Sequence, residues 1–201
     1  MASDAMDPID PDAALMVAFQ KGDTAAFEQL LVKYHRPIVN FIYKIVNNAA
    51  EAEELTQDVF LKIYRARANY EPLAPFAAWI YRIAANVSLK ALGKKRFLRF
   101  GFRPSMHGDG FSGAAELLPD QRPNAERSLV ESETGTIVRE AVRSLPKNEK
   151  LALILRRYEG LSYKEIALVM NCTEAAVKTY IHRGKLRVRD RILPYLTKGL
   201  I

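Results

Sequence analysis

The sequence predicts an all-α protein of two small helical domains joined by a flexible linker. Apolar residues recur at helical spacing through most of the 201 residues, whereas the alternation typical of β-strands is nearly absent. The helical pattern stops between residues 99 and 124, where four glycines and three prolines occur, and we interpret this stretch as the linker. An apolar content of 49% suffices for a hydrophobic core on each side of it.

The first domain is predicted at residues 12–98, after a flexible acidic N-terminus at residues 1–11. Asp23 is a good N-cap for a helix whose apolar residues continue at intervals of three and four as far as Ile45. Pro37 lies inside this pattern, where a proline can bend a helix. The pattern therefore predicts one long element that faces the core.

Two more helices complete this domain, and with the two segments of the long element before and after Pro37 they make four. One is expected from near Asn48 to about Ala68, and the other begins at Pro75. The latter places Phe76 on its apolar stripe, so we assign this aromatic side chain to the core. A separate polar stripe of the same helix, at a spacing of four residues, consists of Arg82, Asn86 and Lys90.

The second domain, at residues 125–201, carries the most specific local signal. Ser162-Tyr163-Lys164-Glu165 is a capping box that starts a short helix, and Thr173 is an N-cap for a longer one, which together favour a helix-turn-helix. Gly184 lies on the buried stripe of the longer helix and permits close approach to the preceding helix. The outer face of the longer helix combines basic and small polar side chains that suit the major groove of DNA. These residues are Lys178, Thr179, His182, Arg183 and Lys185.

Charge is distributed in two basic blocks. Residues 35–102 hold eleven bases and five acids, and residues 136–201 hold fourteen bases and six acids, while the stretch before each block is acidic. The second block continues with Arg187, Arg189 and Arg191, which are well placed for phosphates. A net charge of +7 fits a polyanionic partner, but the segregation of charge is the stronger indication.

Other features exclude several classes of protein. Cys172 is the single cysteine and has no histidine or cysteine at the spacing of a zinc site, so we expect no disulfide, metal or cofactor. The three histidines are scattered and no acidic pair has supporting residues, so we expect no enzymatic activity. The first twenty residues contain four aspartates and no base, and no apolar run approaches the roughly 20 residues that span a bilayer. We therefore expect a cytoplasmic protein with no direct membrane insertion.

Six short motifs occur in a fixed order. The first domain contains Gly-Asp-Thr-Ala-Ala-Phe at 22–27, Glu-Glu-Leu-Thr-Gln-Asp-Val-Phe at 53–60 and Phe-Ala-Ala-Trp-Ile-Tyr-Arg-Ile-Ala-Ala-Asn at 76–86. The second domain contains Leu-Pro at 145–146, Tyr-Glu-Gly-Leu-Ser-Tyr-Lys-Glu-Ile-Ala at 158–167 and Val-Lys at 177–178. In order and spacing these motifs resemble regions 2 and 4 of the extracytoplasmic-function (ECF) sigma factors of the sigma-70 family.

The resemblance implies a factor that directs bacterial core RNA polymerase to promoters and initiates DNA melting. In that family the helix similar to residues 53–65 docks on the clamp helices of the polymerase's largest subunit, so Glu54, Gln57 and Asp58 are the candidate core-binding residues. A second contact with the flap region of the polymerase is implied as well. The family often has an anti-sigma factor, and we expect one here.

The resemblance also implies two promoter contacts. The loop at residues 70–75 is similar to the loop that captures a base flipped from the minus-ten element, and such capture needs an apolar wall and polar groups. The candidate minus-ten residues are Ala66, Tyr70, Tyr81, Arg82, Asn86 and Lys90. For the minus-thirty-five element, the implied residues are those of the outer face of the longer helix in the second domain. Tyr180 departs from the family, because many relatives have arginine there.

A conventional helix-turn-helix transcriptional regulator that does not bind core polymerase is the alternative, since the second domain alone would permit it. The basic first domain argues against it, because such a regulator usually carries a ligand-sensing or dimerisation domain. Binding to core polymerase separates the two functions.

Overall fold

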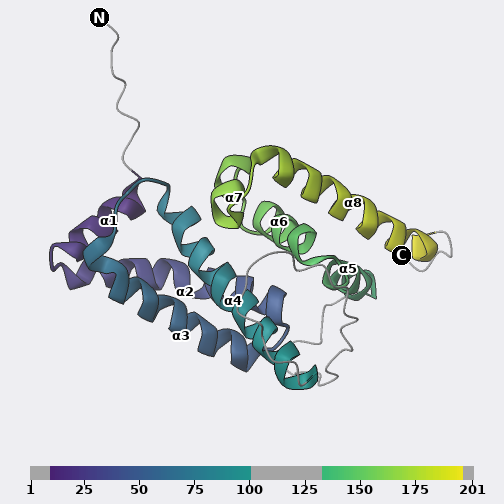
Figure 1. Ribbon diagram of the computed structural model, residues 1–201, viewed down its shortest axis with the longest axis horizontal. Coiled ribbons are helices and arrows are strands. Elements are labelled where there is room, and N and C mark those ends of the chain that lie inside the picture. The colour runs from purple at the N-terminus through teal and green to yellow at the C-terminus, as the bar shows by residue number, and fades with distance from the viewer. Residues whose placement is uncertain (1–9, 101–132, 197–201) are drawn as a thin grey trace, which may run out of the picture.

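The computed structural model describes residues 10–100 and 133–196, and the regular elements in these residues are all helices (Figure 1). The all-α fold class is therefore confirmed. Residues 1–9 and 101–132, which include most of the predicted N-terminal tail and linker, lie outside the described residues. The helices are α1 (Pro11–Gln20), α2 (Thr24–Val46), α3 (Ala49–Ala66), the short 3₁₀ helix η1 (Arg67–Asn69), α4 (Phe76–Phe100), α5 (Glu133–Arg143), α6 (Lys147–Arg157), α7 (Tyr163–Met170) and α8 (Glu174–Leu196). We call α1 to α4 the N-terminal unit and α5 to α8 the C-terminal unit.

The long predicted helix is a single element, α2. Its N-cap is Asp23, whose carboxylate accepts hydrogen bonds from the backbone amides of Ala25 and Ala26 at 3.0 and 3.3 Å. Pro37 lies inside α2 without ending it. The residues that follow it, Ile38 and Phe41, are completely buried, and this packing offsets the backbone hydrogen bond that a proline cannot donate.

The first helix, α1, is an element that the sequence pattern did not reveal. Asp10 is its N-cap and Pro11 occupies its first turn, where a proline is well tolerated. Asp12 is 8% exposed, and its carboxylate binds the Lys33 ammonium and the Tyr34 hydroxyl of α2, each at 2.6 Å. A buried polar contact of this kind fixes α1 on α2.

Aromatic side chains join α4 to the rest of the N-terminal unit. Phe76 is completely buried, as predicted, and its ring lies 5.3 Å from that of Tyr34. Trp79 packs between the start of α4 and the preceding loop, with its ring 5.0 Å from that of Tyr70. The loop that leads into α4 is therefore attached to the core through its first residue.

The C-terminal unit contains the predicted helix-turn-helix. The capping box is present, because the Ser162 hydroxyl accepts from the Glu165 amide at 3.2 Å and the Glu165 carboxylate accepts from the Ser162 amide at 2.7 Å. Asn171 adopts a left-handed conformation with φ of 51° and ends α7. At Gly184 a Cβ atom would stand 2.6 Å from Leu153 of α6, so the close neighbour of this glycine is α6 and not the preceding helix α7.

Candidate polymerase and promoter interfaces

The three candidate core-binding residues share the exposed side of α3. Glu54, Gln57 and Asp58 are all exposed, whereas the opposite side of the helix is buried in the core. The same exposed side continues along the helix to Leu61, which is 50% exposed. An apolar side chain in that position adds contact area to a polar face, and its spacing of three residues from Asp58 is the signal that could have identified it.

The polar stripe of α4 is also present. Arg82, Asn86 and Lys90 are exposed and succeed one another at intervals of four residues, so they lie along one side of the helix. Polar and basic groups arranged in a line can follow a nucleic-acid strand. The structure thus brings three of the six candidate minus-ten residues together.

Tyr70 begins the loop that precedes α4, and its side chain points into the protein. It is 5% exposed, and its buried hydroxyl has no hydrogen-bond partner among the residues that the structure describes. Burial and, to a smaller extent, the nearby Asp10 carboxylate raise the pKa of Tyr70 to about 12. The neutral ring supports the loop from inside in this conformation, while Ala66 just before it is half-buried.

Tyr81 lies on a different side of α4 from the polar stripe. It is 5% exposed, and its hydroxyl donates a hydrogen bond of 2.5 Å to the Glu159 carboxylate of the C-terminal unit. Burial and this hydrogen bond raise the pKa of Tyr81. A contact between Tyr81 and DNA is therefore incompatible with the arrangement seen here and requires the two units to separate.

Glu159 is the centre of what we call the inter-unit contact, which consists of Lys44, Tyr81, Lys150, Tyr158 and Glu159. The Lys44 ammonium lies 3.7 Å from the Glu159 carboxylate and 4.7 Å from the centre of the Tyr158 ring. The Lys150 ammonium donates to the Ile45 carbonyl at 3.3 Å. Burial, together with the charge of Arg143, lowers the pKa of Lys150 to about 8. Figure 1 shows the result, with α7 lying against α4.

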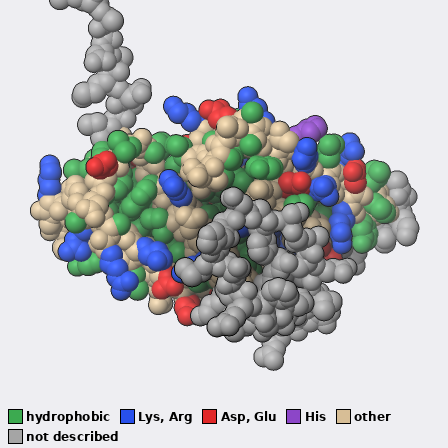
Figure 2. Space-filling model, in the orientation of Figure 1, with side chains coloured by type: hydrophobic (Ala, Val, Ile, Leu, Met, Phe, Trp, Pro, Cys, Tyr) green, Lys and Arg blue, Asp and Glu red, His purple; other side chains and the backbone are tan. Residues whose placement is uncertain are grey.

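The outer face of α8 is exposed as predicted. Lys178, Thr179, His182, Arg183 and Lys185 are all exposed. Lys and Arg side chains gather over α8 in Figure 2, with acidic side chains among them. Tyr180 is half-buried, and its hydroxyl lies 3.5 Å from the Asn148 amide of α6, so this departure from the family does not lie on the outer face.

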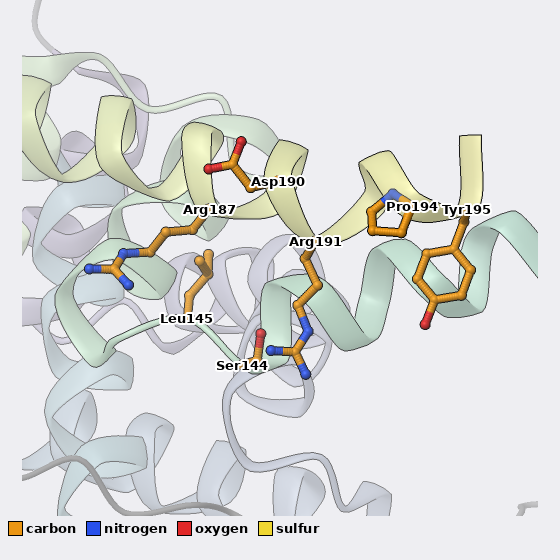
Figure 3. Close-up of a pocket in the computed structure, with 7 residues that line it drawn as sticks. All are labelled: Ser144, Leu145, Arg187, Asp190, Arg191, Pro194 and Tyr195. Carbon is orange, nitrogen blue, oxygen red and sulfur yellow. The ribbon is translucent and has the colours of Figure 1, made fainter. Parts of the chain in front are cut away.

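The basic run beyond Lys185 is partly engaged within the protein. The Arg187 guanidinium lies 3.1 Å from the carboxylate of Glu149, whose side chain is 8% exposed, and that of Arg189 lies 2.8 Å from Asp190. Arg187 and Arg191 line a hollow of about 610 Å³ between α8 and Ser144, just after α5, and the Arg191 side chain points toward Ser144 (Figure 3). Arg187 and Arg191 therefore lie on a different side of α8 from the outer face.

Within residues 10–100 and 133–196, no group of three histidine, cysteine or acidic side chains is arranged to hold a metal ion. Nor is any helix in that part of the chain both long enough and apolar enough to span a membrane.

The two units together define a DNA-binding protein with a basic helix-turn-helix in one half and a separate helical bundle in the other. Comparison with known sequences gives the family. Residues 30–97 match the family described as Sigma-70 region 2, and residues 136–188 match Sigma-70, region 4. The RNA polymerase sigma-H factor of Pseudomonas aeruginosa is 33% identical over 194 residues, which cover 94% of this chain and 97% of that protein.

Two further similarities agree with this match. The ECF RNA polymerase sigma-E factor of Escherichia coli is 28% identical over 193 residues, or 93% of this chain and 97% of that protein. The solved structure of the sigma factor RpoE in complex with the anti-sigma factor NepR from Bartonella quintana has a TM-score of 0.59 at 20% identity, over 83% of this chain and 96% of that chain. The chain belongs to the ECF sigma factors of the sigma-70 family, and it directs RNA polymerase in transcription initiation.

Proposed function

We propose that this sigma factor binds core polymerase and the two promoter elements through three separate surfaces. The exposed side of α3 binds the clamp helices of core polymerase, the polar stripe of α4 and the loop before it bind the minus-ten element, and the outer face of α8 binds the minus-thirty-five element. This proposal is supported by the exposure of a continuous row of polar side chains on each of these helices. The factor itself does no catalysis, and it acts in the cytoplasm, where the polymerase is.

Melting of the promoter then depends on capture of a flipped base. Unstacking a base costs a few kcal/mol, and contacts in the holoenzyme offset that cost without ATP hydrolysis. The loop at residues 70–75 suits this role because Pro72 and Pro75 restrict its backbone and Leu73 is 86% exposed at its tip. Asn86 and Arg82 supply polar groups on the adjoining helix.

Recognition of the minus-thirty-five element is assigned to the outer face of α8. Lys178, His182 and Arg183 can reach base edges or phosphates from a helix in the major groove. Thr179 retains its acceptor lone pairs, although its hydroxyl donates to the Ala175 carbonyl at 3.0 Å. Lys185 adds a phosphate contact that salt would weaken.

An anti-sigma factor is the proposed regulatory partner. RpoE, which has the same fold, is held by such a protein in its solved complex. A partner of this kind would compete with core polymerase for the factor, and pull-down of the full chain with its cellular partners in the absence of core tests for it.

The experiment that tests the proposed function is core binding followed by run-off transcription. The purified full chain is mixed with bacterial core polymerase, and the holoenzyme is tested on a fragment library of the host genome. We expect initiation that depends on the factor, at sites that share two promoter elements. Failure to bind core, with binding to duplex DNA retained, would make the protein a conventional helix-turn-helix regulator.

A further inference from the structure

The loop at residues 70–75 makes few backbone hydrogen bonds of its own. The Tyr70 amide donates to the Arg67 carbonyl at 3.3 Å, and the Leu73 amide donates to the Glu71 carbonyl at 2.9 Å. The prolines at positions 72 and 75 have no N–H group to donate. Contacts from outside the loop must therefore contribute to its position.

One such contact comes from Gln20, the last residue of α1. Its side-chain amide donates two hydrogen bonds, to the Ala68 carbonyl at 3.0 Å and to the Tyr70 carbonyl at 3.2 Å. Both carbonyls belong to the turn that leads into the loop. The side-chain amide of Gln20 thus fixes the beginning of the loop through two hydrogen bonds.

The other contact comes from Asp10, at the opposite end of α1. One carboxylate oxygen accepts from the Asp12 amide at 3.0 Å and caps α1, while the other accepts from the Phe76 amide at 2.6 Å and caps α4. The Phe76 amide marks the end of the loop. Because a helix rises 1.5 Å per residue, Asp10 and Gln20 lie about 15 Å apart along α1.

The helix that carries these two residues is itself rigidly attached. Asp12 is bound to Lys33 and Tyr34, and Met16 and Phe19 are buried in the core. The loop is therefore attached to α2 through α1, in addition to the packing of its own first residue, Tyr70, in the core. Both Asp10 and Gln20 precede residue 30, where the match to region 2 begins.

We propose that Gln20 and Asp10 are positioning residues for selection of the minus-ten base. They do not touch DNA, but they fix the two ends of the capturing loop and so set which base its tip accepts. This inference rests on the proposed function of the loop. It adds a role for α1 that neither the motifs nor the exposed polar faces indicate.

The first test compares holoenzymes on promoters that carry each of the four bases at the captured position. Gln20→Ala is expected to reduce the discrimination between the preferred and the other bases about five-fold, the effect of roughly one hydrogen bond, with core affinity unchanged. Gln29→Ala, which changes an exposed glutamine of α2, is the matched control and should retain full discrimination.

A second pair of variants tests the other end of the loop. Asp10→Ala removes the acceptors for both the Asp12 and the Phe76 amides and should reduce discrimination as well, whereas Asp10→Asn retains one acceptor oxygen, which can serve only one of the two amides, and should give a smaller loss. Unchanged discrimination in both Gln20→Ala and Asp10→Ala overturns the proposal, as does a parallel loss of core affinity, which would indicate general unfolding.

Hydrogen exchange of the free, full-length protein provides a measurement that does not depend on transcription. The backbone amides of residues 70–76 should exchange faster in Gln20→Ala and Asp10→Ala than in the wild type. Unaltered exchange overturns the positioning role even if the factor is active. If the wild-type chain fails to bind core polymerase, the proposed function falls, and this exchange measurement alone then decides whether α1 positions the loop.

Discussion

Asp58 is a single carboxylate on the exposed side of α3, and it provides a direct test of the core-binding surface. Asp58→Arg reverses its charge without disturbing the core, because the side chain is exposed. We expect affinity for core polymerase to fall by about ten-fold or more, since the variant would place like charges together at the interface, which is unfavourable. Titration of labelled factor with core measures the change.

The matched control for this variant is Glu28→Arg on α2, which makes the same change of charge at another exposed position. It should leave core affinity nearly unaltered. Equal affinities for wild type and Asp58→Arg would remove Asp58 from the interface.

Asn86 lies at the middle of the polar stripe of α4 and is assigned to the minus-ten element. Asn86→Ala should weaken transcription more than it weakens core binding, because a base-edge contact is lost while α3 is unchanged. Abortive-initiation assays at several promoter concentrations, run beside the core titration, separate the two effects. A loss of the same size in both assays would contradict the assignment.

At the scale of the element, the capping box of α7 sets the start of the helix-turn-helix. Ser162→Ala removes the acceptor for the Glu165 amide and should destabilise the C-terminal unit by about 1 kcal/mol. Ser162→Asp retains an acceptor and should lose much less. Urea unfolding of the full chain measures both, and indistinguishable unfolding of Ser162→Ala and wild type would show that the cap contributes little.

The elements whose signals are local were predictable from the sequence. Asp23 and Ser162 cap their helices through amides two or three residues away, so a short sequence window contains the whole interaction. Helix α1 was not predicted, although the structure shows that its N-cap Asp10 and Pro11 in its first turn are also local features. Gln20 binds carbonyls 48 and 50 residues away, and no local pattern indicates such a contact.

The same reasoning applies to the candidate interfaces. Exposed stripes on α3, α4 and α8 follow from helical periodicity, and each was found where the sequence predicted it. The engagement of Tyr81 could not be predicted, because its ring packs against Phe41 and its hydroxyl donates to Glu159 in the other unit. Contacts between distant segments are decided by tertiary packing and not by residue spacing.

At the scale of the whole molecule, Glu159 holds the two units together through Lys44 and Tyr81. Glu159→Ala removes both contacts and leaves the Tyr81 hydroxyl buried without a partner, which is unfavourable. We expect the units to separate more often, with a larger radius of gyration by small-angle X-ray scattering. Glu140→Ala, at an exposed position of α5, is the control, and equal radii for all three proteins would contradict the role of Glu159.

Lys150 makes the stability of the folded arrangement depend on pH. Its pKa is lowered from 10.5 to about 8, so between these values the unfolded chain binds a proton that the folded chain does not. The free energy of unfolding should therefore gain a contribution that rises with pH from about 8. Above pH 10 the buried Tyr34 and Tyr81, whose pKa values are raised, lower the free energy of unfolding as the pH rises, because the unfolded chain loses protons that the folded chain keeps.

Comparison with Lys150→Met isolates this effect. Urea unfolding between pH 8 and pH 10 should show a smaller rise in stability for this variant than for the wild type, while Lys147→Met, at an exposed position of the same helix, keeps the wild-type slope. Parallel slopes for wild type and Lys150→Met would show that Lys150 remains charged in the fold.

The hydrogen bond between Tyr81 and Glu159 makes the C-terminal unit an internal competitor for one side of α4. A competitor on the same chain has an effective concentration set by its tether, on the order of millimolar for short connections, and dilution cannot release it. Short promoter fragments added to the free factor can therefore reach the exposed polar stripe of α4 but not the side that Tyr81 occupies, whatever the concentration of the protein. If core polymerase engages both units, as the family resemblance implies, it would separate them, and access to this side of α4 would then depend on how much polymerase is available and not on how much factor is present.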